Sequence, residues 1–186
     1  MNKALIIIGI QEDYFKEGAC ELTNSLDISL KAKKLMDFFR TNSLPIFHIQ
    51  HSNAIRPEAT SLLPETRGIN IHKNVEPIMG EIVIEKNFPN SFLQTNLESS
   101  LENLNIQELV LCGMMTHLCI DATTRAAFDL GFNCMLAHDA CTSKDMNFQD
   151  NTVKHKDVHN AFISALAGYA ELLSADEIVQ TLELES

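Results

Sequence analysis

The sequence predicts a single-domain, doubly wound α/β fold with a mostly parallel sheet and helices on both of its faces. Short apolar runs alternate with longer amphipathic segments from one end of the 186-residue chain to the other. The short runs are apolar at successive positions, as expected of strands that are buried on both sides. No linker, repeat or low-complexity block divides the series, and one domain of ordinary size accommodates this length.

The strands are predicted from the apolar runs and the helices from the periodic segments between them. The predicted strands are ALIII at residues 4–8, PIFHI at 45–49, EIVIE at 81–85, ELVLCG at 108–113, FNCMLA at 132–137 and a short last strand near 170–173. The predicted helices are 26–42, 93–104, 119–130, 155–169 and a helix from residue 175. In the first helix Ile28, Ala32, Leu35 and Phe39 recur at the spacing of one helix face.

The acidic composition excludes several classes of partner. Fourteen Lys and Arg against 25 Asp and Glu give a formal charge of −11, which offers no basic surface to nucleic acid. No apolar run approaches the roughly 18 residues of a membrane span, and the start MNKALIII lacks the features of a signal peptide. Five cysteines without C-x-x-C spacing argue against a disulfide framework. We therefore expect a cytoplasmic protein that acts at neither a membrane nor a nucleic acid.

The candidate site residues are those that follow each predicted strand, because ligands of doubly wound folds bind outside the carboxyl ends of the strands. They are Gly9 with residues 11–13, residues 50–53, Lys86, residues 113–119, and His138 with Asp139. The long irregular segment 52–77 is expected to be a lid or a binding element beside them.

Cys119 and Lys86 are the chemically distinctive pair in this set. Cys119 lies where a strand gives way to a helix, and the free N–H groups and dipole of a helix start favour a thiolate. Lys86 directly follows an apolar strand, where an ammonium can stabilise a thiolate or an oxyanion. Taken singly, an inert buried cysteine and a solvated lysine are the simpler interpretations. Their arrival at one edge of the sheet favours a nucleophilic site.

The histidine spacing does not predict a metal site. His48 and His51 are three residues apart in HIQH, so both reach one ion only if His51 has already left the strand. His155 and His159 are four apart on a predicted helix, where the second is more simply a structural partner. No G-x-G-x-x-G follows the first strand, which disfavours a nicotinamide cofactor. We expect neither a metal nor a cofactor.

Several segments resemble the motifs of the isochorismatase-like cysteine hydrolases, in the isochorismatase/nicotinamidase superfamily. ALIIIGIQEDYF is similar to the family's opening motif, EKNFPNSF to its lysine motif and GMMTHLCIDATTRAAFDLGF to its nucleophile motif, and HDAC and VHNAFISALAG also match. The resemblance covers nearly the whole chain and implies a six-stranded parallel sheet, homodimers or larger oligomers, and a catalytic Asp, Lys and Cys. The lysine falls on Lys86 and the cysteine on Cys119, but the aspartate falls on Gly9.

The resemblance also implies a mechanism. The aspartate takes the thiol proton, the thiolate attacks a carbonyl carbon of a small molecule, and the proton passes to the departing amine before water hydrolyses the thioester. Backbone N–H groups of Met115 and Cys119 form the oxyanion hole, with a non-proline cis peptide around Met114. A vinyl-ether hydrolase need not use the cysteine, so Cys119 favours an amide-type C–N bond. The nicotinamidase branch carries a D-x-H-P pattern that HIQHSN lacks.

Gly9 leaves three interpretations open. In the first, Asp13, or Glu12 on the same loop, replaces the missing base directly or through a water, although Asp13 matches an aspartate whose role in the family is local. In the second, no carboxylate offsets the positive charge of Lys86, so this charge acts fully on the sulfur. The thiol is then readily alkylated, but hydrolysis is slow. In the third, the glycine was introduced by engineering. The alternative function is an impaired relative that binds a metabolite or a protein partner.

The sequence does not name the substrate beyond a small molecule. The residues expected to line its pocket are the polar Gln11, Gln50 and Asn87 and the apolar Phe15, Phe88, Phe92 and Leu118, with segment 52–77. His117 is expected to line the pocket, to donate at the oxyanion or to face a neighbouring subunit.

Overall fold

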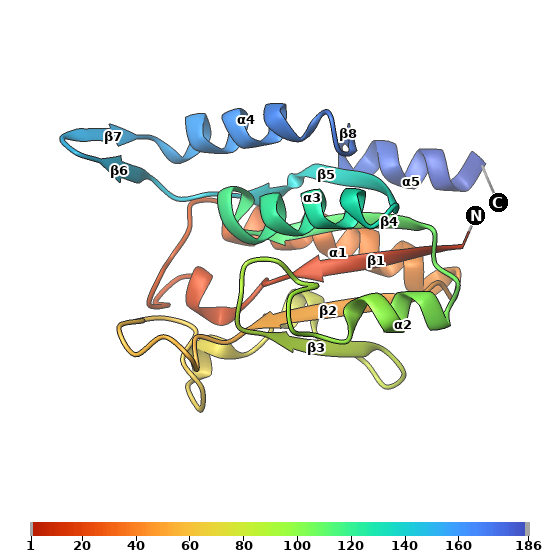
Figure 1. Ribbon diagram of the computed structural model, residues 1–186, viewed down its shortest axis with the longest axis horizontal. Helices are drawn as coiled ribbons and strands as arrows, with labels where there is room; N and C mark the ends of the chain where they lie inside the picture. The colour runs from red at the N-terminus through yellow and green to blue at the C-terminus, as the bar shows by residue number, and fades with distance from the viewer. Residues whose placement is uncertain (1, 185–186) are drawn as a thin grey trace.

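The computed structural model describes residues 2–184 and confirms the doubly wound fold, with six parallel strands in one sheet (Figure 1). The strand order is β3-β2-β1-β4-β5-β8, and every pair is parallel. The strands are β1 (Lys3–Ile8), β2 (Ile46–His51), β3 (Ile82–Lys86), β4 (Glu108–Met114), β5 (Asn133–Thr142) and β8 (Glu171–Leu173). All six predicted strands are therefore present.

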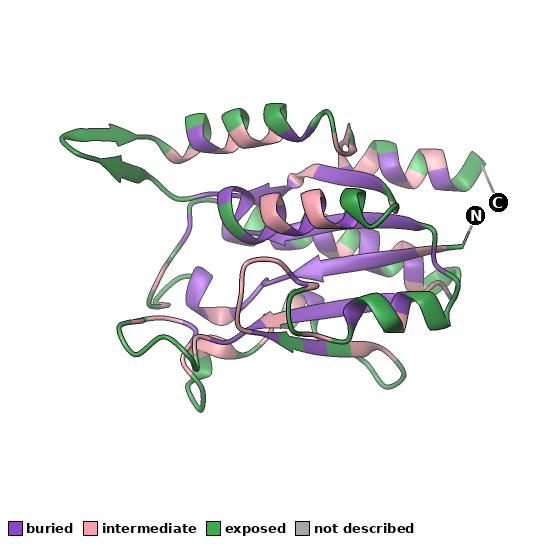
Figure 2. Ribbon diagram, in the orientation of Figure 1, coloured by how far each residue is buried: buried purple, intermediate pink, exposed green. Residues whose placement is uncertain are grey.

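Two layers of helices cover the sheet, and each has its own apolar core. Helices α1 (Ser25–Thr41) and α5 (Ala175–Leu184) pack on one face, and α2 (Leu97–Asn103), α3 (Asp121–Asp129) and α4 (His155–Leu166) on the other (Figure 1). Leu5 of β1 belongs to the first core and Ile6 to the second. Because both faces of each central strand are covered, these strands are buried along their length (Figure 2).

A two-stranded hairpin between β5 and α4 is absent from the sequence prediction. Its strands are β6 (Met146–Phe148) and β7 (Asn151–Val153), and all six of their residues are exposed, as the green arm in Figure 2 shows. A strand buried on neither face carries no apolar periodicity, so the pattern that revealed the other strands could not reveal these.

Two predicted boundaries also differ from the structure. The helix expected over 93–104 begins only at Leu97, after a turn in which Thr95 donates its hydroxyl to the carbonyl of Ser91. Strand β5 continues past residue 137 to Thr142 and places HDAC within the sheet. This extension accompanies an irregularity in the β4–β5 register between Leu111 and Gly113.

The strand order reverses between β1 and β4, and the carboxyl ends of these two strands flank the expected ligand crevice. Ile8 pairs with Gly113, which has φ +134° and whose added Cβ would lie 1.9 Å from the Ile8 carbonyl oxygen. Only glycine allows so close a backbone approach. No helix among residues 2–184 has the length and apolar character needed to cross a membrane.

An ionic cluster at the β2–β3 edge ties helix α1 to the sheet. Arg40 donates from Nε and Nη2 to the two carboxylate oxygens of Glu81, at 2.7 and 2.9 Å, and His48 Nε2 lies 2.8 Å from Glu81 Oε2. Burial alone would raise the pKa of Glu81, but the hydrogen bonds from Arg40, the Ile78 N–H and His48 lower it to about 2.

We expect Glu81→Gln to cost about 1.5–3 kcal/mol of unfolding free energy at pH 7, the range for hydrogen bonds to charged groups. Because the folded pKa is depressed, this stabilisation is complete above the unfolded pKa and is lost as pH falls toward about 2. Urea unfolding at stepped pH should show the difference from wild type shrinking with acid, and exposed Glu102→Gln is the control. A difference independent of pH would contradict this assignment.

Candidate functional site

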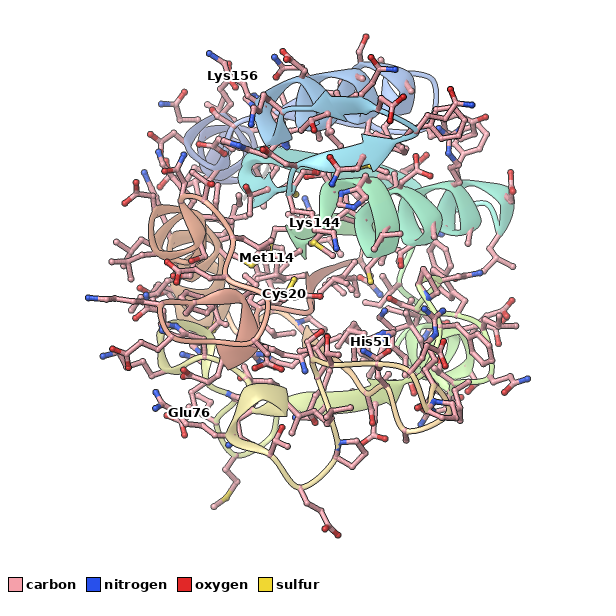
Figure 3. The ribbon with its side chains drawn as sticks, turned by 90° about the vertical axis from the view of Figure 1, so that its left-hand side faces the viewer. Cys20, His51, Glu76, Met114, Lys144 and Lys156 are labelled. Atoms are coloured by element: carbon pink, nitrogen blue, oxygen red, sulfur yellow. The ribbon has the colours of Figure 1, made fainter. Side chains whose placement is uncertain are left out.

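The candidate site lies at the carboxyl edge of the sheet, which faces the viewer in Figure 3. Met114 at the end of β4 lies near the middle of this view, with Lys144 above it, Cys20 just below it and His51 of β2 further below. Side chains from two strands, β2 and β4, and from the loops that follow β1 and β5 therefore converge here, as the parallel topology predicts.

Cys119 lies in a π-helical turn, Thr116–Ile120, that joins β4 directly to α3. The N–H groups of Leu118 and Ile120 both donate to the Met115 carbonyl, at 3.1 and 3.2 Å. The Met114–Met115 peptide is cis, as the resemblance implied. The predicted strand-to-helix junction is confirmed, with the difference that the cysteine precedes the α-helix proper in a wider turn.

Two histidines anchor this nucleophile turn to its surroundings. Thr116 Oγ1 lies 2.9 Å from His159 Nδ1 on α4, so His159 is the structural partner that its position indicated. His117 Nδ1 lies 2.9 Å from the hydroxyl of Ser143, and the ring is 7 % exposed with a lowered pKa caused by burial. His117 therefore points into the chain, which argues against the expectation that it faces a neighbouring subunit.

Lys86, the last residue of β3, places its ammonium against the sulfur. Its Nζ lies 3.1 Å from Cys119 Sγ, and it also donates to the carbonyls of Phe88 at 2.8 Å and Pro89 at 3.2 Å. The side chain is only 1 % exposed, and this burial lowers the pKa of Lys86 although the charge of Cys119 acts to raise it. The predicted Cys119 and Lys86 pair is thus in direct contact.

His51 lies on the far side of the lysine, a contact that sequence reasoning missed. Its Nδ1 is 3.0 Å from Lys86 Nζ and its Nε2 is 3.0 Å from Asn53 Oδ1. Burial, and then the charge of Lys86, lower the pKa of His51 to about 4, so the ring is neutral at pH 7. His51 is still within β2, and His48 has a different partner, Glu81. Across residues 2–184, no three His, Cys, Asp or Glu side chains are arranged to hold a metal ion.

Gly9 occupies a backbone conformation that suits glycine. Its φ is +61°, its N–H donates to the Ile49 carbonyl at 2.8 Å, and an added Cβ would lie 2.8 Å from the Met114 carbonyl oxygen. The strand end that should present an aspartate therefore presents a left-handed turn against the start of the nucleophile segment. No side chain extends from this position toward the sulfur.

The two nearby carboxylates do not take the vacant place. Asp13 is 7 % exposed, and it accepts hydrogen bonds from the backbone N–H groups of Ala19 at 3.1 Å and Leu62 at 2.5 Å. Glu12 pairs instead with Arg67 at 3.4 Å. The structure therefore argues against the interpretation in which Asp13 replaces the base directly, because both of its oxygens hold backbone segments in place. Its local role is the one its motif position indicated.

Tyr14 is a further neighbour of the sulfur that the sequence did not reveal. The residue is 5 % exposed, and its pKa is raised well above the ordinary value by burial, then by the negative charge of Cys119. Tyr14 follows the polar run Gln11 to Asp13, and nothing in its spacing indicates that its hydroxyl belongs to the site.

The predicted pocket residues Gln11 and Gln50 are bonded to the backbone. Gln11 is fully buried, with its amide bonded to the backbone of His51 and Ile69, so it shapes the site and is not free to fix a substrate as predicted. Gln50 likewise donates to the Ile69 carbonyl at 2.8 Å.

The aromatic residues are also engaged. Phe15 stacks on His72 at 3.7 Å and lines a cavity of about 790 Å³ that neither Cys119 nor Lys86 borders. Phe92 packs on Phe132 at 6.1 Å. Phe88 stays beside Lys86 through its carbonyl.

Asn87 and Leu118 remain the most available of the predicted pocket residues. Asn87 Oδ1 is buried with no hydrogen-bond partner in the described part of the chain, and Leu118 is 40 % exposed beside Cys119. A buried acceptor without a partner is costly unless a ligand or water supplies a donor. Asn87 therefore stays a candidate for holding a substrate.

Comparisons with known proteins show which family this chain is similar to. The family model described as Isochorismatase domain matches residues 3–172. The isochorismatase family protein YddQ of Bacillus subtilis is 40 % identical over 97 % of this chain and 100 % of its own length. Nicotinamidase 3 of Arabidopsis thaliana is 26 % identical over 96 % of this chain and 88 % of its own. The crystal structure of a putative isochorismatase hydrolase from Oleispira antarctica has TM-score 0.91 and 41 % identity, covering 96 % of both chains.

We expect Gly9→Ala and Gly9→Asp to lower the free energy of unfolding by about 1–3 kcal/mol, because a Cβ at this left-handed position is strained and meets the Met114 carbonyl. Gly168→Ala is the matched control, since nothing lies within 4 Å of its added Cβ. Urea unfolding of the three variants checks the expectation. Equal stability of Gly9→Ala and wild type would show that the turn relaxes freely.

Proposed function

The chain belongs to the isochorismatase family, and we propose that it is a cysteine hydrolase that cleaves an amide-type C–N bond of a small molecule. The observation that carries the proposal is the 3.1 Å contact between Lys86 Nζ and Cys119 Sγ at the sheet edge. A buried ammonium beside a sulfur favours the thiolate, the form that attacks carbonyl carbon.

The reaction follows from this pair. The thiol proton is already on Lys86, which stands as an ammonium beside the thiolate, and Sγ attacks the substrate carbonyl while the carbonyl oxygen becomes an oxyanion. The backbone N–H groups of Met115 and Cys119 are the proposed oxyanion donors. The C–N bond breaks as Lys86 returns a proton to the departing nitrogen, and water then hydrolyses the thioester.

Gly9 favours a second candidate function. A family member without a carboxylate at this position can bind a metabolite or a protein partner and turn it over weakly or not at all, since each positioned proton transfer is typically worth about 10²- to 10⁴-fold in rate. Intact-mass analysis after incubation with candidate amides separates the two. Product release supports the hydrolase, whereas a persistent acyl adduct on Cys119, or neither, supports the impaired protein.

The charges around the site support an anionic substrate. Arg56 lies near enough to lower the pKa of both His51 and Lys86, and Lys144 lowers that of His117, in each case after the larger effect of burial. Both are exposed, and neither has a carboxylate partner among residues 2–184. Unpaired cations on a chain of net charge −11 favour a ligand that brings its own negative charge.

We expect Lys86→Met to slow alkylation of Cys119 by iodoacetamide at pH 7 by about tenfold or more, because an opposite charge this close shifts ionisation by one to several orders of magnitude. Peptide mapping locates the label, and Lys33→Met, which changes a half-buried lysine on α1 paired with Asp37, is the control. Alkylation unchanged by Lys86→Met would remove the basis of the proposal.

We also expect a preference for anionic amides. A dicarboxylic acid monoamide should be hydrolysed with a KM about tenfold below that of the matching neutral diamide, and Arg56→Ala should abolish most of this preference while leaving the diamide unaffected. Release of ammonia measures both reactions. A preference that survives Arg56→Ala would assign the recognition elsewhere.

A further inference from the structure

We propose that His51 is a positioning residue for this reaction, and that Cys119, Lys86 and His51 form a hydrogen-bonded relay which replaces the carboxylate missing at Gly9. The inference rests on the proposed hydrolase function and names the residue that completes it. Its geometry follows the general logic of a nucleophile, a base in contact with it, and a third group that orients the base.

The number of acceptors around Lys86 makes His51 part of the proton chemistry. An ammonium has three protons to donate, whereas Nζ has four acceptors within 3.2 Å: the carbonyls of Phe88 and Pro89, His51 Nδ1 and Cys119 Sγ. The two carbonyls can only accept, so they hold two of the protons. The third is shared between the sulfur and the imidazole, which lie 3.1 and 3.0 Å from Nζ.

Asn53 fixes the tautomer in which His51 can accept. Asn53 Nδ2 donates to the Ser61 carbonyl at 2.9 Å, and a carbonyl cannot donate, so the amide oxygen must face the imidazole. His51 Nε2 therefore carries the hydrogen that bonds to Asn53 Oδ1 at 3.0 Å. In the neutral ring this leaves the lone pair on Nδ1, directed at Lys86.

Gln11 holds the backbone of His51 on both sides. Its Oε1 accepts from the His51 N–H at 2.8 Å, and its Nε2 donates to the His51 carbonyl at 2.9 Å. The amide also donates to the Ile69 carbonyl at 2.7 Å. The imidazole is thus fixed through both its main chain and its ring, as a base-orienting group requires.

The charges that face His51 change its basicity in the course of the reaction. Lys86 from β3 and Arg56 from the following loop lower its pKa, after the larger effect of burial, while the hydrogen bond to Asn53 raises it. When Lys86 gives up a proton, it loses its charge and no longer lowers the pKa of His51. His51 therefore becomes more basic at the stage when the site must recover a proton.

The relay balances over the whole reaction. In acylation the Sγ–C bond forms, the C–N bond breaks and Lys86 gives one proton to the departing nitrogen. The two protons left on neutral Lys86 remain hydrogen-bonded to the carbonyls, so its lone pair faces His51 and the sulfur. In hydrolysis the water O–C bond forms and the C–Sγ bond breaks. The water proton is taken up by Lys86, which is hydrogen-bonded to His51. The sulfur leaves as thiolate beside the restored ammonium.

The test uses p-nitrophenyl acetate, because its leaving group departs without a proton. Lys86 then remains an ammonium in the acyl-enzyme, so the proton of the hydrolytic water must pass through the Lys86 contact to neutral His51 and from there to solvent. His51→Asn places an amide oxygen at about the position of Nδ1, which keeps the acceptor for Lys86 but cannot take a proton. We expect the burst of p-nitrophenolate to stay within about threefold of wild type and the steady-state rate to fall about tenfold or more. Acetylated Cys119 should then accumulate in the intact-mass spectrum. His155→Gln, a histidine substitution on α4, is the matched control.

A second variant reads the pH profile and does not depend on the first. Neutral His51 is the accepting form, so the steady-state rate of wild type should fall with acid as pH passes about 4. Asn53→Asp puts a carboxylate beside Nε2, raises the pKa of His51 and should move this acid limb upward by about one pH unit or more. Circular dichroism confirms that each variant is folded.

The outcomes separate the relay from the proposed function. Equal steady-state rates for wild type and His51→Asn, with acetyl-Cys119 formed in both, overturn the relay and leave the hydrolase. An acid limb that Asn53→Asp does not move also overturns the relay. A wild-type chain that never acetylates at Cys119 overturns both proposals.

Discussion

The contact between Lys86 and Cys119 is the constraint on which the rest of the site depends. A buried ammonium is stable only where several acceptors surround it, since the effective penalty for burying an unpaired ion is several kcal/mol. The carbonyls of Phe88 and Pro89 and the imidazole of His51 supply neutral acceptors, and the sulfur alone can supply negative charge. The fold therefore places the ammonium of Lys86 against the one neighbour in its surroundings that can carry a negative charge.

Most of the fold could be predicted from the sequence because its sheet is parallel and is covered by helices on both faces. Strands such as β1 and β4 are apolar on both sides, so each reads as a continuous run, and the edge where their carboxyl ends meet follows from topology. This reasoning brought Lys86 and Cys119 together correctly. It failed for the hairpin of β6 and β7, which buries nothing, and for the length of β5, which depends on its register with β4.

The side-chain partners within the site could not be predicted in the same way. His51 and Asn53 fall within the predicted candidate positions 50–53, but the sequence does not show which neighbour each side chain reaches, and it gives no indication of Tyr14. The left-handed backbone of Gly9 and its approach to Met114 are also invisible in the sequence, which shows only that an expected aspartate is missing. Asp13 and Gln11 illustrate the opposite error, because polar residues at the right edge were assigned to chemistry although the backbone occupies them.

The tripeptide from Gln11 to Asp13 determines what substitutions in this segment would do to the site. Gln11 fastens the main chain at His51, and Asp13 fastens Leu62 in the long loop that also carries Asn53. One short piece of chain thus sets the alignment of groups drawn from two separate parts of the molecule. Substitutions in this tripeptide would therefore displace His51 and Asn53 while the sheet and helices keep their fold, because the side chains of Gln11 and Asp13 are bonded to main-chain groups.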